Sequence, residues 1–232
     1  MKNSIEVTNL CRNFGSFEAL KNVSLVARPN ETLAIFGHNG AGKTTLLKIL
    51  STVMKATSGN VLYGGLDMQK DPEKILSNIG VISHRSFLYS SLTALDNLTF
   101  YARLYSVPDR NVRIKHLLTA MGLRTRMYDK VGTFSRGMQQ RLSIARALLH
   151  DPGIILMDEP ESGLDNKASE TLWQLLNEKK RTIILTHHNL ERGYAVANRF
   201  IILARGSVFF APDNKCPLAE LEAAYSASLE VA

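Results

Sequence analysis

The 232-residue sequence has only two cysteines and no apolar run that could cross a bilayer. Its longest apolar runs, at residues 154–157 and 200–204, have the length of a strand, whereas a membrane-spanning helix needs about 20 apolar residues. Cys11 and Cys216 have no metal-ligand spacing and form no disulfide framework, which agrees with a reducing cytosol. These absences argue against an integral membrane protein, a disulfide-stapled secreted domain and a cysteine metal site.

The sequence also lacks an internal repeat, a low-complexity tract and a recognisable linker. Its start, MKNSIEVTNL, has no apolar core of the signal-peptide kind, so we expect no signal peptide. A hydrophobic content of 45% suits a globular core. The formal charge of +7 is spread along the chain, so a basic surface is as good an explanation as a nucleic-acid groove.

The order of apolar segments predicts an α/β fold. Alternating apolar residues within positions 1–30 indicate short antiparallel strands. Further on, strand-like runs at 32–36, 79–83, 153–157, 181–185 and 199–203 are separated by helical segments, and residues from about 90 to 150 are mostly helical. Strands that alternate with helices predict a parallel sheet covered on both faces.

Residues 37–45, GHNGAGKTT, fit the phosphate-loop pattern G-x-x-x-x-G-K-[ST]. A strand precedes them and a helix follows, which is the context that this motif needs. Gly37 and Gly42 let main-chain N–H groups wrap the β- and γ-phosphates, Lys43 supplies a positive charge, and the Thr44 hydroxyl can bind Mg²⁺. We expect the remaining loop residues to join them in binding ATP: Asn39, Gly40, Ala41 and Thr45.

Polar side chains follow two of the later strands. Asp158 and Glu159 come directly after the apolar strand 154–157, where an unpaired carboxylate would be costly unless a cation lies near it. Asp158 is therefore the expected acid on the Mg²⁺ side, acting through water, and Glu159 the expected base that polarises the attacking water. His187 follows the strand at 181–185, and ligands of α/β sheets lie at such strand ends, so it could contact the γ-phosphate. We expect His188 to be a bystander.

Residues 133–141, TFSRGMQQR, open a helix with a serine at the N-cap position and a glycine in the first turn. Ser135 alone would cap the helix. Gly137 costs about 1 kcal/mol against alanine there, so its presence needs a separate reason.

The segment FSRGMQQRLSIARALLHDPGIILMDEPESGLD, at 134–165, closely resembles the signature helix, Walker B strand and D-loop of ATP-binding-cassette ATPases. The resemblance runs from about residue 5 to about 210. It implies a P-loop NTPase fold with a RecA-like parallel-sheet core, a small antiparallel β subdomain and a helical subdomain inserted at about 86–150. Residues 1–210 would then form a single ATPase domain, with 211–232 as a tail of unknown role that could be a surface helix or a partner contact.

The resemblance also implies that two copies pair head to tail around ATP. Ser135 and Gly137 of one copy would then face the γ-phosphate held by the other, and the glycine would let that phosphate approach. Phe14 matches the position where the family stacks an aromatic ring on adenine. Asp165 matches the D-loop aspartate, which organises the dimer interface in the family.

Two positions depart from the family pattern. His84 stands where a glutamine usually reaches Mg²⁺, and imidazole is a poor ligand for that ion, so water-mediated contact or coupling to the membrane partner is the expected role. Arg136 and Met138 replace neutral residues of the usual Leu-Ser-Gly-Gly-Gln signature, and we assign Met138 no phosphate contact.

The resemblance predicts Mg²⁺-dependent ATP hydrolysis that drives a membrane transporter. The chain would be a peripheral subunit on the cytoplasmic face of the inner or plasma membrane, bound to separate permease subunits. Three segments look most like the ATPase of the haem exporter used in cytochrome c maturation: 82–105, 135–152 and 186–200. The alternatives are ATPases of other exporters, of drug or polysaccharide type.

A soluble cassette protein that acts on ribosomes or DNA is a further alternative, with the +7 charge as its footprint. Such translation factors resemble two fused cassettes, and the DNA-repair members carry a long coiled coil. This sequence has one cassette and no heptad stretch, so we expect no nucleic-acid partner.

Overall fold

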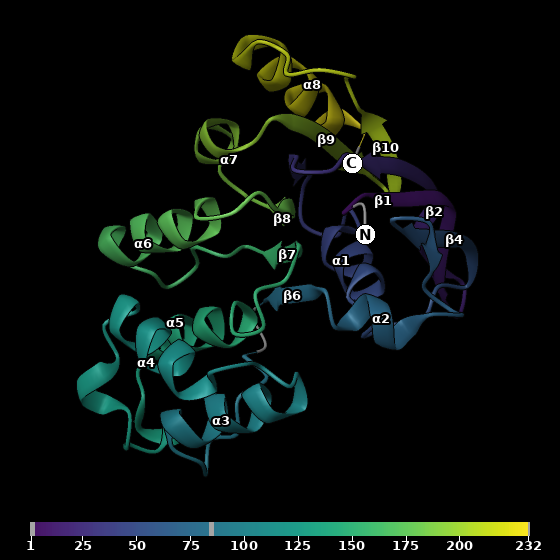
Figure 1. Cartoon of the computed structure of the whole chain (residues 1–232). Coiled ribbons are helices and arrows are strands. Elements are labelled where there is room, and N and C mark those ends of the chain that lie inside the picture. The colour runs from purple at the N-terminus through teal and green to yellow at the C-terminus, as the bar shows by residue number, and fades with distance from the viewer. Residues whose placement is uncertain (1–2, 84–85, 232) are drawn as a thin grey trace.

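The computed structural model describes residues 3–83 and 86–231 and has a six-stranded sheet at its centre (Figure 1). Five of its strands are parallel and the edge strand β10 is antiparallel to β9. The strand order is β10 (Ser207–Phe210), β9 (Arg199–Ala204), β3 (Thr32–Phe36), β8 (Thr182–Thr186), β7 (Ile154–Asp158) and β6 (Ile79–Ile82). The predicted parallel sheet is confirmed, and β3, β7 and β8 lie side by side in it.

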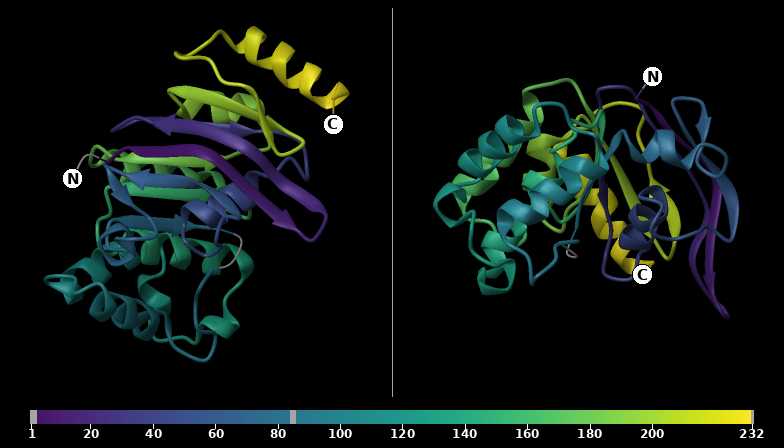
Figure 2. Two further views of the ribbon diagram at one scale, coloured as in Figure 1. Left: turned by 90° about the vertical axis from the view of Figure 1, so that its right-hand side faces the viewer. Right: turned by 60° about the horizontal axis from the view of Figure 1, so that its bottom comes forward.

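A second, smaller sheet is antiparallel and contains the start of the chain. Its order is β2 (Phe17–Ala27), β1 (Ile5–Phe14), β4 (Ser58–Tyr63) and β5 (Leu66–Asp67). The long β1–β2 hairpin projects to the side of the molecule opposite the teal helical segment, as the right-hand view of Figure 2 shows. The antiparallel strands expected in the first 30 residues are therefore confirmed.

The six-stranded sheet is covered on both faces, and its strands alternate between two apolar cores. In β3, Ala34 and Phe36 face one core while Leu33 and Ile35 face the other. Six helices cover the first core: α3 (Ala94–Leu104), α4 (Arg110–Ala120), α5 (Arg136–Ala147), α6 (Asn166–Asn177), α7 (Leu190–Val196) and α8 (Leu218–Glu230). The small sheet, α1 (Lys43–Leu50) and α2 (Pro72–Leu76) cover the second. Side chains that point alternately to opposite faces of a strand explain why these strands are apolar throughout.

Helices α3, α4 and α5 gather beside β6 at one end of the molecule (Figure 1). Thr93 and Asp96 form a capping box that starts α3, and a break that contains Val107, Pro108 and Asp109 separates α3 from α4. Two 3₁₀ turns, Arg124–Arg126 and Val131–Thr133, lead into α5. This arrangement places the start of α5 beside the loop that follows β7.

Some elements go beyond the sequence prediction. The segment after 210, which the sequence left open between a surface helix and a partner contact, contains a helix, α8, whose Leu221 is fully buried against the main core. The strand β10 and the short elements β5 and α2 were not predicted. None of the helices in the described part of the chain combines the length and the apolar character needed to cross a membrane.

Candidate functional site

The loop between β3 and α1 exposes main-chain N–H groups at the start of a helix. Gly42 caps α1 in the left-handed conformation, with a φ of 103°, and no side chain caps the helix. A Cβ at this position would lie 2.7 Å from the Ala19 carbonyl oxygen, so only glycine fits the turn. The first N–H groups of the helix are thus left for a ligand, and a helix N-terminus attracts anions.

The ammonium group of Lys43 lies inside this loop. Its Nζ donates to the carbonyl oxygens of Gly37, at 2.6 Å, and His38, at 2.9 Å. Burial lowers the pKa of Lys43, while the charges of Glu159 and Asp158 oppose that shift. The lysine is therefore a cation at the mouth of the loop with two carboxylates nearby, which is the charge pattern expected around a bound phosphate and a metal ion.

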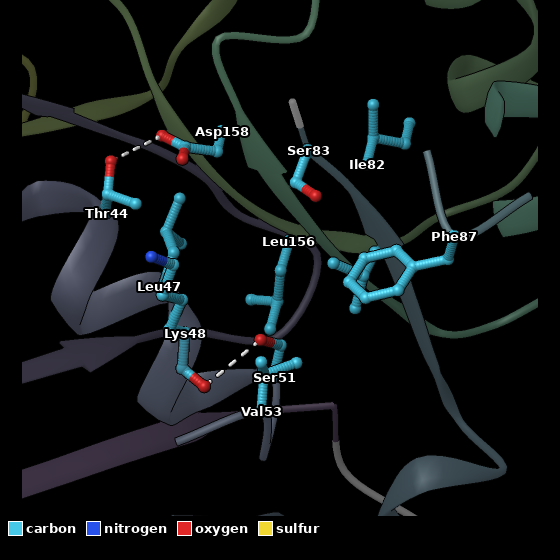
Figure 3. Close-up of a pocket in the computed structure, with 11 residues that line it drawn as sticks. Thr44, Leu47, Lys48, Ser51, Val53, Ile82, Ser83, Phe87, Leu156 and Asp158 are labelled. Carbon is cyan, nitrogen blue, oxygen red and sulfur yellow. Dashed lines mark hydrogen bonds between the residues drawn. The ribbon is translucent and has the colours of Figure 1, made fainter. Parts of the chain in front are cut away.

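Asp158 ends β7 and accepts hydrogen bonds from two hydroxyl groups. Its Oδ1 accepts hydrogen bonds from Thr186, at 2.7 Å, and Thr44, at 3.3 Å, and the residue is buried. Figure 3 shows the pair of Thr44 and Asp158 at the first turn of α1. A hydroxyl and a carboxylate are hard oxygen donors, and Mg²⁺ commonly binds one or two protein oxygens while water and phosphates complete its shell.

The described residues hold no group of three or more histidine, cysteine, aspartate or glutamate side chains that could bind a metal on their own. The hydroxyl of Thr44 and the carboxylate of Asp158 are oxygen donors of the kind that Mg²⁺ prefers, so this donor set fits the ion.

Glu159 has a left-handed backbone, with a φ of 50°, which is unusual for a residue other than glycine. Its main-chain N–H donates to the Thr186 hydroxyl at 3.1 Å. Thr186 thus holds both acidic residues, since its hydroxyl also donates to Asp158. Glu159 lines the same cavity as Lys43, and Asp158 is not among the residues that line it.

This cavity has a volume of about 230 Å³ and combines three kinds of lining residue. They are the aromatic rings of Phe14 and Phe17 with Ala19, the loop residues Asn39, Gly40, Ala41, Gly42, Lys43, Thr44 and Thr45, and the carboxylate of Glu159. A cavity lined by both exposed aromatic rings and phosphate-binding groups has partners for the base and for the phosphates of a nucleotide. The sequence singled out Phe14 and missed Phe17, which forms the other side of the same hairpin.

His187 is buried at the end of β8 and has two polar partners. Its Nδ1 accepts a hydrogen bond from the main-chain N–H of Asn189 at 3.0 Å, and its Nε2 lies 3.6 Å from Oε2 of Glu161. His188, the expected bystander, is the histidine near Glu159, with 3.8 Å between Nδ1 and Oε2. The structure therefore brings His187 to the expected strand end but beside Glu161, which the sequence analysis did not select.

Ser135 caps α5, as predicted, by accepting a hydrogen bond from the main-chain N–H of Met138 at 3.3 Å. A Cβ on Gly137 would lie 2.8 Å from the carbonyl oxygen of Gly163, in the loop that follows β7. The glycine thus has a reason within one chain, because any side chain would push against that main-chain oxygen. Its role toward a second copy stays a prediction.

Asp165 caps α6, since its Oδ1 accepts from the main-chain N–H of Ala168 at 2.8 Å. The aspartate is exposed, and its role at a dimer interface also stays a prediction. His84 lies outside the described residues.

A second cavity, of about 250 Å³, borders Thr44 and Asp158 from the side of β6 (Figure 3). Apart from a few polar groups it is lined by apolar side chains, among them Leu47, Leu156 and Phe87. Thr44 lines both cavities, and Lys48 adds a positive charge to the lining of the second.

A protein-family profile described as "ABC transporter" matches residues 20–162. The ABC transporter ATP-binding protein NatA of Bacillus subtilis is 36% identical over 216 residues, which cover 89% of this chain and 88% of NatA. The linearmycin resistance ATP-binding protein LnrL, also of Bacillus subtilis, is 33% identical over 88% of this chain and 67% of its own length.

Solved structures agree with the sequence relatives. The ATP-binding subunit of an ABC transporter superposes with a TM-score of 0.87 at 28% identity, covering 97% of this chain and 96% of that one. The ATP-binding cassette MJ0796, as a dimer in a post-hydrolysis state with ADP and phosphate, gives a TM-score of 0.81 at 29% identity, over 92% of this chain and 99% of that one. The expected P-loop NTPase fold is confirmed.

Proposed function

This chain belongs to the ABC transporter family as an ATP-binding subunit with ATPase activity, and from this premise we propose that its ATP hydrolysis, with Mg²⁺, drives transport through separate permease subunits. The observation that carries the proposal is the convergence at the ends of β3, β7 and β8. The phosphate loop with Lys43, the Asp158–Glu159 pair and His187 lie there at the carboxyl ends of the parallel strands, where ligands of α/β folds bind.

Each residue has a role that its surroundings support. The loop N–H groups and Lys43 bind the β- and γ-phosphates and stabilise the charge that develops on them. Glu159 accepts a proton from a water molecule as the water oxygen attacks the γ-phosphorus. The bond from that phosphorus to the bridging oxygen breaks, so ADP and inorganic phosphate leave. The proposed contact of His187 with the γ-phosphate would use its Nε2–H, which faces Glu161 in this structure and would have to turn toward the phosphate.

Thr44 and Asp158 would hold Mg²⁺, the latter through water. When bound, the ion offsets the negative charge of the phosphates. The contact between these two side chains and their hard oxygen donors support this assignment.

We further propose a dimer in which Ser135 and Gly137 of one copy face the nucleotide of the other, with Asp165 at the interface. The solved MJ0796 cassette is a dimer at 29% identity to this chain, which supports the assembly. Residues 1–210 would act as one ATPase domain, with the helices within about 86–150 as the part that contacts the permease at the cytoplasmic face of the membrane.

The transported substrate has two candidates. Haem export for cytochrome c maturation rests on the likeness of the three segments noted above. A drug-type export function is favoured by LnrL, whose name records linearmycin resistance. Deleting the gene and staining for c-type cytochromes, alongside growth under antimicrobial challenge, separates the two: loss of haem staining supports the first and increased drug sensitivity the second.

The ATPase roles are tested with Glu159→Gln in the purified chain. We expect turnover to fall at least 100-fold while ATP binding is retained, because the base is lost but the phosphate loop is intact. Glu170→Gln, on the exposed side of α6, is the matched control. Wild-type turnover in Glu159→Gln would show that Glu159 is not the base.

Purification from detergent extracts tests the proposed membrane partner, since a permease should copurify with the chain.

A further inference from the structure

Arg12 lies against the aromatic ring that borders the nucleotide cavity. The two residues are two positions apart in β1, and the guanidinium carbon of Arg12 is 4.5 Å from the centroid of the Phe14 ring. A ring has two faces, and the guanidinium covers one of them. Among the described residues, those that line the cavity include Phe14 and not Arg12. Phe14 thus borders the cavity while the arginine stacked on its ring does not, which fits a ligand that approaches the ring face opposite Arg12.

The guanidinium is tied to the segment that follows α1. Nη1 of Arg12 donates to the main-chain carbonyl of Lys55 at 3.1 Å. The neighbouring main chain is fixed to the same segment, because the N–H of Asn13 donates to the Thr57 hydroxyl at 3.0 Å and the N–H of Thr57 to the Cys11 carbonyl at 2.8 Å. The tip of β1 is thus joined to the chain that leaves the phosphate-binding helix, so the ring and the phosphate loop are held by one framework.

We propose that Arg12 is a positioning residue for the nucleotide base: it fixes the Phe14 ring by a cation–π contact so that the free face accepts a purine. This inference rests on the proposed ATPase function. Phe14 is 43% exposed, so without a backing group its ring would lose rotational freedom each time a base stacked on it. The guanidinium removes that cost in advance and draws electron density from the ring, which favours an electron-rich base on the other side.

Phe17 provides the internal comparison. It lines the same cavity and is 62% exposed, but among the described residues no cation is stacked on its ring. If a backed ring is what binds the base, Phe14 and not Phe17 carries the affinity.

The test compares two ligands that share phosphates and differ in the base. Dissociation constants for ATP and for inorganic tripolyphosphate are measured on the full chain by calorimetry, for wild type, Arg12→Met, Arg12→Lys, Phe14→Ala and the Arg12→Met/Phe14→Ala double variant. Lys70→Met, which removes one positive charge from an exposed side chain near the small sheet, is the charge control. Thermal unfolding of each variant checks that it is folded.

We expect Arg12→Met to raise the Kd for ATP about three- to tenfold and that for tripolyphosphate by less than about twofold. Arg12→Lys should fall between, because it keeps the charge and loses the planar stack. In the Phe14→Ala background, Arg12→Met should add nothing, and in steady-state hydrolysis KM should rise with kcat unchanged.

Equal losses for both ligands, or an additive double variant, would overturn the inference, since Arg12 would then act by its charge or independently of the ring. If Arg12→Met is unfolded, Arg12→Lys decides: wild-type ATP affinity in that variant overturns the inference. A wild-type chain that binds neither ligand contradicts the proposed ATPase function instead, so the two failures are distinguishable.

Discussion

Nε2 of His187 lies 3.6 Å from Oε2 of Glu161, and this pair joins the ends of the neighbouring strands β7 and β8. Because Nδ1 of His187 accepts from the Asn189 N–H, the neutral ring carries its hydrogen on Nε2, the atom that faces the carboxylate. Oε1 of Glu161 accepts from Trp173 Nε1 at 2.7 Å. The carboxylate is therefore fixed at one oxygen and faces the histidine with the other.

This pair predicts a pH-dependent contribution of Glu161 to stability. Hydrogen bonds from His187 and Trp173 lower the pKa of Glu161 from 4.5 to about 2, against the opposing effect of burial. A lowered folded-state pKa stabilises the protein above the unfolded value, near pH 4.5, and that stabilisation is lost as the pH falls toward 2. Replacing Glu161 by Gln should lower the free energy of unfolding by about 2 to 3 kcal/mol at pH 7.

The measurement is urea unfolding of wild type and Glu161→Gln from pH 7 downward. The gap between them should be constant above about pH 5 and shrink below pH 4.5, and Glu170→Gln should show no such gap. A gap that stays the same at every pH at which the protein folds would mean that the charge of Glu161 contributes nothing.

His150 gives a second pH dependence, of a different origin. Its ring stacks on Tyr105, with 3.9 Å between centroids and 9° between planes, and burial lowers its pKa from 6.5 to about 4. The unfolded chain then binds a proton that the folded chain does not, so this histidine causes stability to fall as the pH drops from about 6.5 toward 4, by up to about 3 kcal/mol. His150→Asn should remove that slope. Because the substitution also removes the stacked ring, the slope between pH 7 and 5, rather than the absolute stability, is the quantity to compare.

The sequence predicted the parts of the site that follow from strand order. The phosphate loop, the Asp158–Glu159 pair and His187 each follow an apolar strand. Because β3, β7 and β8 are parallel neighbours, their carboxyl ends lie together and bring these groups close to one another. The phosphate loop and the N-cap at Ser135 were local patterns and needed no tertiary information.

The remaining contacts depend on backbone paths that no local pattern records. Glu161 reaches His187 only because the chain after β7 turns at Glu159, where φ is positive, and a glutamate carries no signal for that conformation. The close approach of Gly137 to the Gly163 carbonyl likewise involves two segments far apart in sequence, so no local pattern could predict it. The sequence left the tail open between a surface helix and a partner contact, and α8 owes its place to burial of Leu221.

The contact between Gly137 and Gly163 makes a prediction with a definite sign. In an ordinary helix, glycine to alanine stabilises by about 1 kcal/mol. Here the new methyl group would lie 2.8 Å from a main-chain oxygen, so either α5 or the loop after β7 must move. Gly137→Ala should therefore lower the melting temperature, while Arg136→Ala, at the exposed neighbouring position, should leave it unchanged or slightly raised. A higher melting temperature for Gly137→Ala would contradict this prediction and show that the loop after β7 can move away from the methyl group without destabilising the protein.

Thr44 allows the proposed magnesium site to be tested apart from nucleotide binding. Thr44→Val keeps the side-chain shape and removes the hydroxyl that contacts Asp158 at 3.3 Å. We expect the Mg²⁺ concentration for half-maximal ATPase activity to rise at least about tenfold, since one of the two proposed oxygen ligands is lost. ATP binding measured in EDTA should stay within about twofold of wild type, because the loop N–H groups and Lys43 are untouched.

Thr44→Ser retains the hydroxyl and should behave as wild type. An unchanged magnesium dependence in Thr44→Val would place the ion elsewhere, whereas equal losses with and without the metal would assign Thr44 to the nucleotide itself.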